Sequence, residues 1–176
     1  MIGVAELDSM PRARAAELLR SCCGSKAWVS ATLDRRPFRS RDNLLRVADE
    51  VWGALDAMDW LEAFGHHPRI GESKSAAPQD ERAQGWSADE QAAARDLSPA
   101  IRAGLARANA TYVKRFGYIC IIYATGKSAE ELLSITEARL ENDPATELGV
   151  AVEEQRKITR LRLEKLVSAG AAGPTA

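Results

Sequence analysis

The stretch SRDNLLRVADEVWGALDAM, residues 40–58, has the pattern of a capped amphipathic helix. Ser40 is a residue type that accepts hydrogen bonds from the free N–H groups of a helix N-terminus. The apolar residues that follow it recur at helical spacing, at Leu44, Leu45, Val47, Val51 and Leu55. The stretch therefore predicts a helix that buries one face against a hydrophobic core.

Similar start and stop signals recur along most of the chain. They predict helices at RARAAELLRSCC (12–23), KAWVSATL (26–33), Ser98-Pro99 to Phe116, after a Ser128/Glu131 capping box, and from Asp143-Pro144 to about Val167. The length of 176 residues suits one globular domain. We therefore predict an all-α, single-domain bundle of about seven to nine helices over residues 1–168, followed by a flexible tail, 169–176.

One segment does not fit the helical pattern. GYICIIYATG, residues 117–126, is apolar, β-branched and aromatic, and it has no obvious partner strand. It is either a buried helical turn or an extended core segment, and in the second case its main-chain groups need other partners. An extended segment would also have amides to offer a ligand.

Composition narrows the class of protein. The 24 Lys and Arg residues balance the 25 Asp and Glu residues, which argues against a nucleic-acid partner. The sequence has no signal-peptide pattern at its start and no apolar run long enough to cross a membrane. The three cysteines, Cys22, Cys23 and Cys120, lack metal-ligand spacing and suit a reducing compartment. We expect a cytoplasmic protein without membrane contact.

The two histidines of the chain are adjacent, within GHHPRIGES, residues 65–73. Because Pro68 disfavours a helical conformation for the residue before it, His67 is expected at a turn that ends a helix. A partly exposed loop histidine is one reading of this pattern, and a functional imidazole is another. A metal site formed by His66, His67 and Glu72 is a third, although no known metal-binding spacing is present.

Two further residues carry charge at informative places. In WSADEQ, residues 86–91, Ser87 and Glu90 have the spacing of a capping box, which would place Glu90 in a first helical turn where its charge is stabilised. The free N–H groups of such a turn could also bind an anion. In the last helix, Arg162 falls within the apolar stripe while Arg160 falls outside it. Arg162 therefore either extends its charged group from the rim of the core to solvent, or pairs with an internal acid or an anionic ligand.

Several motifs together resemble the family of 2-oxo-4-hydroxy-4-carboxy-5-ureidoimidazoline (OHCU) decarboxylases. They occur in the family's order and span residues 8 to about 167. The motifs are HPRIGE (67–72), SADEQ (87–91), NATYVKRFGYICI (109–121), RLENDPATEL (139–148) and KITRLRL (157–163).

The resemblance implies an all-α, usually dimeric lyase that needs no cofactor and no metal. It implies decarboxylation of OHCU to (S)-allantoin and CO2 in urate degradation. By the same resemblance His67, Glu90 and Arg162 are expected to be catalytic. Substrate contacts are expected from Pro68, Ser87, Gln91 and the main chain of Cys120, Ile121, Ile122, Tyr123 and Ala124.

Two other classes of protein remain possible from the sequence. A non-catalytic helical binding module that senses ureides would keep the pocket and would show loss of His67 or Glu90, and both residues are present. A metal-dependent amidohydrolase would lose activity with chelators. The chemistry favours the decarboxylase, because loss of CO2 requires stabilisation of a developing anion and delivery of a proton to one face.

Overall fold

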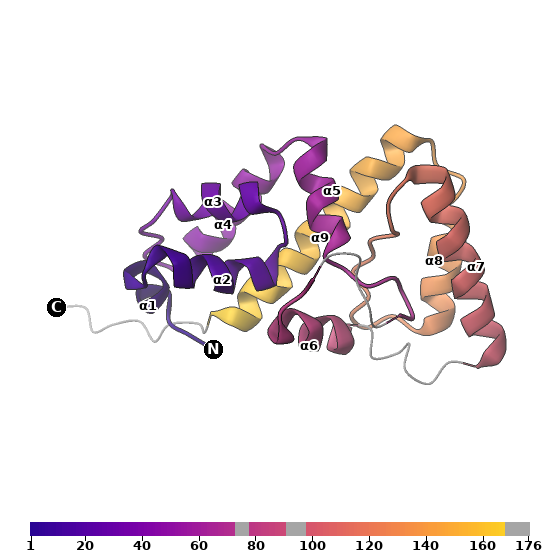
Figure 1. The fold of residues 1–176 in the computed structure, drawn as a ribbon, viewed down its shortest axis with the longest axis horizontal. Coiled ribbons are helices and arrows are strands. Elements are labelled where there is room, and N and C mark those ends of the chain that lie inside the picture. Colours follow the sequence, from indigo (N-terminus) through magenta and orange to yellow (C-terminus); the bar gives the residue numbers. More distant parts are fainter. Residues whose placement is uncertain (73–77, 91–97, 168–176) are drawn as a thin grey trace. The chain divides into compact units, whose positions relative to one another are not determined.

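The computed structural model describes residues 1–72, 78–90 and 98–167. These residues form two compact units, one made of residues 1–62 with the chain from Arg156 onward, the other of Ala63–Gln155. Nine helices lie in the described part of the chain, which contains no strand apart from isolated bridge residues (Figure 1). The predicted all-α class is confirmed. The assignment of residues 1–168 to one domain stays a prediction, and the predicted tail, 169–176, lies outside the described residues.

The first unit begins with four helices. They are α1 (Val4–Ser9), α2 (Arg12–Cys22), α3 (Lys26–Leu33) and α4 (Arg41–Gly53). Helix α3 packs against both α2 and α4. The indole of Trp28 is fully buried there, and its Nε1 donates to the carbonyl of Ala48 at 3.1 Å. The predicted caps are present, because Ser25 Oγ accepts from the amide of Trp28 and Ser40 Oγ from the amide of Asn43.

The helix predicted across residues 41–58 is interrupted. It ends at Gly53, and α5 (Ala57–Gly65) starts after a turn. The carboxylate of Asp56 caps this second helix by accepting from the amides of Met58 and Asp59 at 2.9 and 3.1 Å. Glycine is costly inside a helix and aspartate is favoured at its start, so the two residues together explain the break.

The last helix, α9 (Pro144–Leu166), contains the boundary between the two units. In the first unit, Asp49 Oδ2 of α4 lies 3.2 Å from guanidinium nitrogens of both Arg156 and Arg160. An isolated parallel bridge joins Ile2 to Val167, with the Ile2 amide donating to the carbonyl of Leu166 at 2.9 Å. The ion pairs join α9 to α4, and the bridge joins the end of α9 to the start of the chain.

The second unit contains α6 (Glu81–Glu90), α7 (Pro99–Phe116) and α8 (Ala129–Arg139). Helices α7 and α8 pack side by side (Figure 1), and a Cβ on Gly104 of α7 would lie only 2.8 Å from Leu133 Cδ2 of α8. Helix α7 ends, as predicted, at Gly117, which has a left-handed φ of 83°. The predicted capping box at Ser128 and Glu131 is also confirmed.

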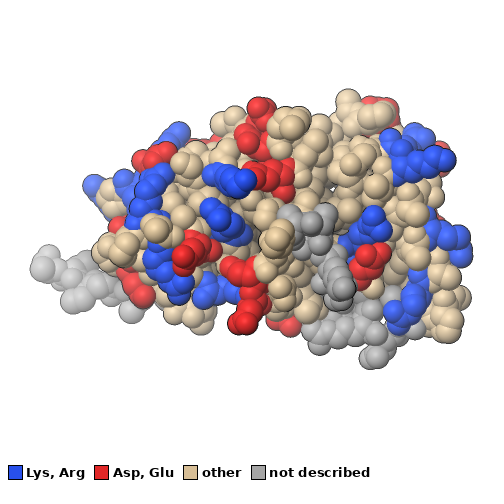
Figure 2. All heavy atoms as spheres, viewed as in Figure 1, with Lys and Arg blue, Asp and Glu red and all other residues tan. Residues whose placement is uncertain are grey.

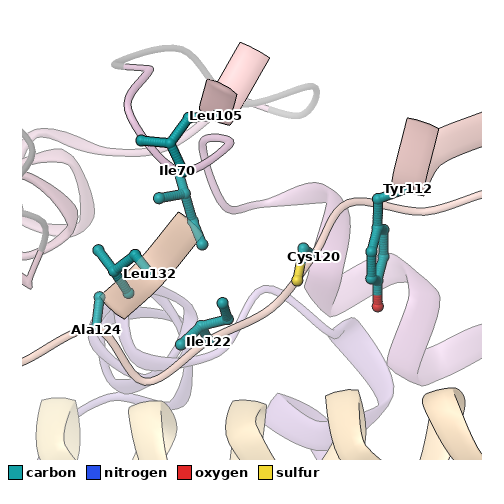
Figure 3. Close-up of a cluster of buried hydrophobic side chains, with 7 residues drawn as sticks. All are labelled: Ile70, Leu105, Tyr112, Cys120, Ile122, Ala124 and Leu132. Carbon is teal, nitrogen blue, oxygen red and sulfur yellow. The ribbon is translucent and has the colours of Figure 1, made fainter. Parts of the chain in front are cut away.

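The segment 117–126, which does not fit the helical pattern of the sequence, has no regular secondary structure. Residues 119–124 are neither helix nor strand, and Cys120, Ile121, Ile122 and Ala124 are buried. Cys120, Ile122 and Ala124 belong to one apolar cluster with Ile70, Leu105, Tyr112 and Leu132 (Figure 3). Of the two alternatives left by the sequence, the buried helical turn is wrong, and the entry of every second residue into this cluster fits an extended segment.

Charged side chains of both signs occur on the face drawn in Figure 2. Among the helices of the described residues, none is long and apolar enough to cross a lipid bilayer.

Candidate active site

His67 lies in the turn that follows α5. The amides of His66 and His67 donate to the carbonyls of Ala63 and Phe64, at 3.1 and 3.0 Å, so the chain leaves the helix in a tight turn before Pro68. Pro68 itself is buried. The side chain of His67 has only 7% of its surface exposed, which overturns the reading of a partly exposed loop histidine. A buried imidazole needs polar partners, so its position is a constrained one.

Ser87 and Glu90 lie on one face of α6. They are 5% and 8% exposed, and Ala83, one turn before Ser87, is buried on the same face. The predicted capping box at Ser87 is wrong, because α6 already begins at Glu81 and the carboxylate of Asp80 accepts from the amide of Ala83 at 2.7 Å. The predicted stabilisation of Glu90 by a helix N-terminus, and the anion site there, are wrong for the same reason.

Gln79 connects the histidine turn to α6. Its side-chain Nε2 donates to the carbonyl of His66 in a short hydrogen bond and lies 3.2 Å from the hydroxyl oxygen of Ser87. One amide group therefore fixes the main chain next to His67 and the side chain of Ser87 together. No sequence pattern around Gln79 predicts this role, because the residue lies in the connection before α6, outside the regular helical patterns.

The HPRIG turn is also tied to the core of the second unit. Asn109 of α7 is buried, and its Nδ2 donates to the carbonyl of Ile70 at 2.9 Å. The side chain of Ile70 packs in the same apolar cluster as Cys120, Ile122 and Ala124 (Figure 3). The structure thus brings together the histidine turn and the extended segment, as expected if both contact one ligand.

The extended segment obtains its main-chain partners from side chains. Arg139 NH1 donates to the carbonyl of Ile121 at 2.6 Å, and the amide of Tyr123 donates to Glu154 Oε2 at 2.7 Å. The carbonyl of Tyr123 accepts from Lys127 Nζ, also at 2.7 Å. These bonds satisfy main-chain groups of the segment, so it can be buried without a partner strand.

Arg139 belongs to a buried polar network. The carboxylate of Glu147, fully buried, accepts from Arg139 Nε at 2.8 Å, from Asn142 Nδ2 at 2.7 Å and from the hydroxyl of Tyr112 in a short bond. Burial, followed by the nearby thiol of Cys120 and the bond to Glu147, raises the pKa of Tyr112 far above its ordinary value. Tyr112 therefore stays protonated and donates to Glu147.

Arg162 belongs to the first unit, on α9. Only 2% of its surface is exposed, whereas the side chain of Arg160 is 45% exposed, so the predicted division between the two arginines is confirmed. The charge of Arg162 acts on the buried thiol of Cys23, but burial outweighs it and raises the pKa of Cys23 to about 12. Thr159 also interacts with this thiol.

The remaining expected residues are placed as follows. Gln91 lies outside the described residues, so its expected substrate contact stays a prediction. Within the described part of the chain, no group of three or more His, Cys, Asp or Glu residues is arranged to hold a metal ion. The assignment of Tyr123 to the site is compatible with its half-buried position.

Comparison with known proteins identifies the family. The model of the OHCU decarboxylase family matches residues 8–164. This chain belongs to the OHCU decarboxylase family. The polar residues Asn109, Tyr112, Arg139, Asn142 and Glu147 all lie within the motifs that carried the resemblance in the sequence.

The chain is similar to several proteins of urate degradation. It is 35% identical over 147 residues to the "Uric acid degradation bifunctional protein TTL" of Arabidopsis thaliana, a match that covers 84% of this chain and 45% of the relative. It is 26% identical over 164 residues to the OHCU decarboxylase of Halalkalicoccus jeotgali, covering 93% of this chain and 90% of the relative. The chain thus spans less than half of the bifunctional relative.

A solved structure supports the same family. A crystal structure of OHCU decarboxylase in the presence of (S)-allantoin matches with a TM-score of 0.73 and 32% identity, covering 85% of this chain and 96% of that one. A crystal structure of (S)-allantoin synthase matches with a TM-score of 0.72 over 94% of this chain. At 18% identity, this second match supports the fold alone.

Proposed function

We propose that this chain is a carboxy-lyase that converts OHCU to (S)-allantoin and CO2 in urate degradation. The observation that carries the proposal is the buried His67, held in its turn beside a buried polar face of α6 by Gln79. Family membership and the solved relative with (S)-allantoin support the choice of substrate. The buried position of His67 is what a general acid or base in a site protected from water requires.

The reaction requires that a proton be delivered to one face of a ring carbon. When the bond between the hydroxyl-bearing ring carbon and its carboxylate breaks, CO2 leaves and the electron pair forms a C=C bond to the neighbouring carbon, which carries the ureido group. The π electrons of the C=N bond at that neighbouring carbon move to its ring nitrogen, which takes up a proton. The hydroxyl then loses its proton and its carbon becomes the new carbonyl, as the C=C electron pair takes a proton at the ureido-bearing carbon. A proton added to one face of the carbon that carries the ureido group gives a single enantiomer.

His67 is proposed as the general acid/base in this sequence, acting at the hydroxyl or at the developing carbanion. Glu90 would orient the imidazole and favour its protonated form, because a buried carboxylate stabilises a neighbouring cation. Such assistance is worth about 10²- to 10⁴-fold in rate. Both residues are buried in the second unit, where water competes weakly for their hydrogen bonds.

Substrate binding is assigned to one charged side chain and to several polar and main-chain groups. Arg162 is proposed to bind the anionic substrate through charge-assisted hydrogen bonds, which suits a buried guanidinium that cannot lose its proton. Pro68, Ser87, Gln91 and the main chain of Cys120, Ile121, Ile122, Tyr123 and Ala124 are proposed to hold the ring and the ureido group. No cofactor or metal is required for this scheme.

The proposal also covers assembly and location. We place the enzyme in the cytoplasm as a homodimer, as the family resemblance implies, with OHCU as its small-molecule partner. Light scattering on the purified chain would report a mass twice the 19.1 kDa of one copy if the dimer forms. A single-copy mass at micromolar concentration would contradict it.

The decisive test is circular dichroism of the allantoin formed when fresh OHCU is generated in situ with purified, chelator-treated protein. Rapid appearance of the (S) signal would establish decarboxylation that needs no removable metal. Slow formation of optically silent product would refute the proposed activity and favour the ureide-binding module. Activity restored only by added metal would instead favour the metal-dependent enzyme.

A further inference from the structure

We propose that Arg139 and Glu154 are positioning residues that set the geometry of the extended segment Cys120–Ala124. They bind successive main-chain groups of this segment, one from α8 and one from α9. The inference rests on the proposed function, because it assumes that the segment contacts substrate. Neither residue is assigned to contact substrate itself.

The main-chain groups of the segment point toward two opposite edges. In an extended backbone, the N–H and C=O groups of residues i and i+2 point to one edge, and those of residue i+1 point to the opposite edge. The carbonyl of Ile121 binds Arg139, and the amide of Tyr123 binds Glu154. The carbonyl of Tyr123 binds Lys127. One edge of the segment is therefore occupied by protein side chains.

The opposite edge is defined by Ile122. Its main-chain N–H and C=O make no hydrogen bond with residues in the described part of the chain. Its side chain is buried in the apolar cluster of Figure 3, which prevents the segment from rotating about its long axis. Holding Ile121 and Tyr123 from one side thus fixes the direction in which the groups of Ile122 point.

Arg139 is suited to this task because more than one hydrogen bond fixes its own position. Its Nε binds the fully buried Glu147, while NH1 remains directed at the carbonyl of Ile121. The planar guanidinium holds these two bonds at a fixed angle, which a lysine ammonium cannot reproduce. The buried ion pair therefore fixes the guanidinium group that binds the segment.

Four variants separate positioning from general structural support. Arg139→Lys keeps the charge and loses the planar fork. Glu154→Ala removes the acceptor for the Tyr123 amide, whereas Glu154→Gln retains an oxygen that can accept it. Asn142→Ala is the matched control, because it removes a hydrogen bond to the same buried carboxylate, and among the described residues no hydrogen bond joins the Asn142 side chain to the segment.

The kinetic test compares KM and kcat for OHCU in these proteins. We expect Arg139→Lys and Glu154→Ala to raise KM about 5- to 10-fold, as for loss of one well-placed hydrogen bond, with a smaller change in kcat. Glu154→Gln should restore a KM close to that of the wild type. Asn142→Ala should lower thermal stability and leave KM unchanged. A role in folding alone would lower the active fraction, and with it apparent kcat, without changing KM.

Hydrogen–deuterium exchange provides a readout that does not depend on turnover. Peptides covering residues 117–127 should exchange faster in Arg139→Lys and Glu154→Ala, and as in the wild type in Glu154→Gln and Asn142→Ala. If the wild type fails to make (S)-allantoin but these exchange differences appear, the proposed function fails and the positioning role stands. Unchanged exchange in Glu154→Ala, or an equal rise of KM in Asn142→Ala, would overturn the positioning role.

Discussion

Arg139 and Glu147 form an ion pair in the interior of the second unit, with the side chain of Arg139 9% exposed and that of Glu147 not exposed at all. Two charges removed from water in this way are stable only while both are present, because either one alone would be left uncompensated. The tyrosine hydroxyl and the asparagine amide described above complete the coordination of the carboxylate.

Replacement of the acid should therefore destabilise the protein strongly. We expect Glu147→Ala to lower the free energy of unfolding by ~3–5 kcal/mol, since it leaves a buried guanidinium without its partner. Urea denaturation followed by circular dichroism measures the change. Glu17→Ala is the control, because Glu17 pairs with Arg14 on the surface with both side chains more than half exposed. A similar small loss in both variants would contradict this account.

The imidazole of His67 should be required for stereospecific turnover. We expect His67→Asn to keep the helical fold and to lose about 10²- to 10⁴-fold of the rate of (S)-allantoin formation. The optical signal of the product is the measurement, because uncatalysed decay gives no enantiomeric excess. His66→Asn, which leaves the main-chain carbonyl bound by Gln79 in place, is the matched control. Near-normal turnover in His67→Asn would reject its assigned role.

Arg160 and Arg162 of α9 should respond differently to the same substitution. We expect Arg162→Lys to weaken both turnover and binding of (S)-allantoin about tenfold or more, because a single ammonium cannot form the two-pronged contact of a guanidinium. Arg160→Lys should have little effect, since Arg160 is half exposed and pairs with Asp49 and Glu164. Titration calorimetry with (S)-allantoin gives the affinities. If Arg162→Lys binds and turns over normally, Arg162 is structural.

The buried thiols predict a loss of stability in alkaline solution. Burial raises the pKa of Cys23 to about 12 and that of Cys120 to about 11, against an ordinary value near 9. The folded protein therefore keeps these protons at a pH where the unfolded chain releases them. Their contribution to stability is fully present below pH 9 and declines as the pH rises from about 9 toward the folded pKa values.

The test is the urea midpoint between pH 7 and pH 11. The midpoint should fall above pH 9 in the wild type. It should fall less steeply in Cys23→Ala, even though that variant starts from a lower stability at pH 7 because it creates a small cavity. Parallel curves for the two proteins would show that Cys23 does not titrate in this way.

Local signals in the sequence were sufficient for much of the fold. Ser98-Pro99 and Gly117 define both ends of α7, and Ser128 with Glu131 defines the start of α8, because capping depends on residues within one turn. Helix α1 was missed, since its cap is Gly3, which makes no side-chain hydrogen bond. The start of α6 was misplaced because Asp80, and not Ser87, provides the cap.

The candidate site was harder to predict, because its supports act across long sequence separations. Asn109 binds a carbonyl 39 residues away, and Glu154 binds an amide 31 residues away. No periodic pattern records such pairs. Arg139 and Glu147 stood inside a recognisable motif, but only their burial shows that they are structural supports and not surface charges.

The pairing of Ile2 with Val167 has a practical consequence for protein engineering. Because these two residues are partners in a β-bridge, a domain fused ahead of Ile2 and a domain fused beyond Val167 would be tethered at almost the same point. A circular permutant that joins these ends through a short linker would need little change in the path of the main chain. In an engineered fusion protein, an attached domain could thus be placed before or after this chain and be held near the same point of its surface.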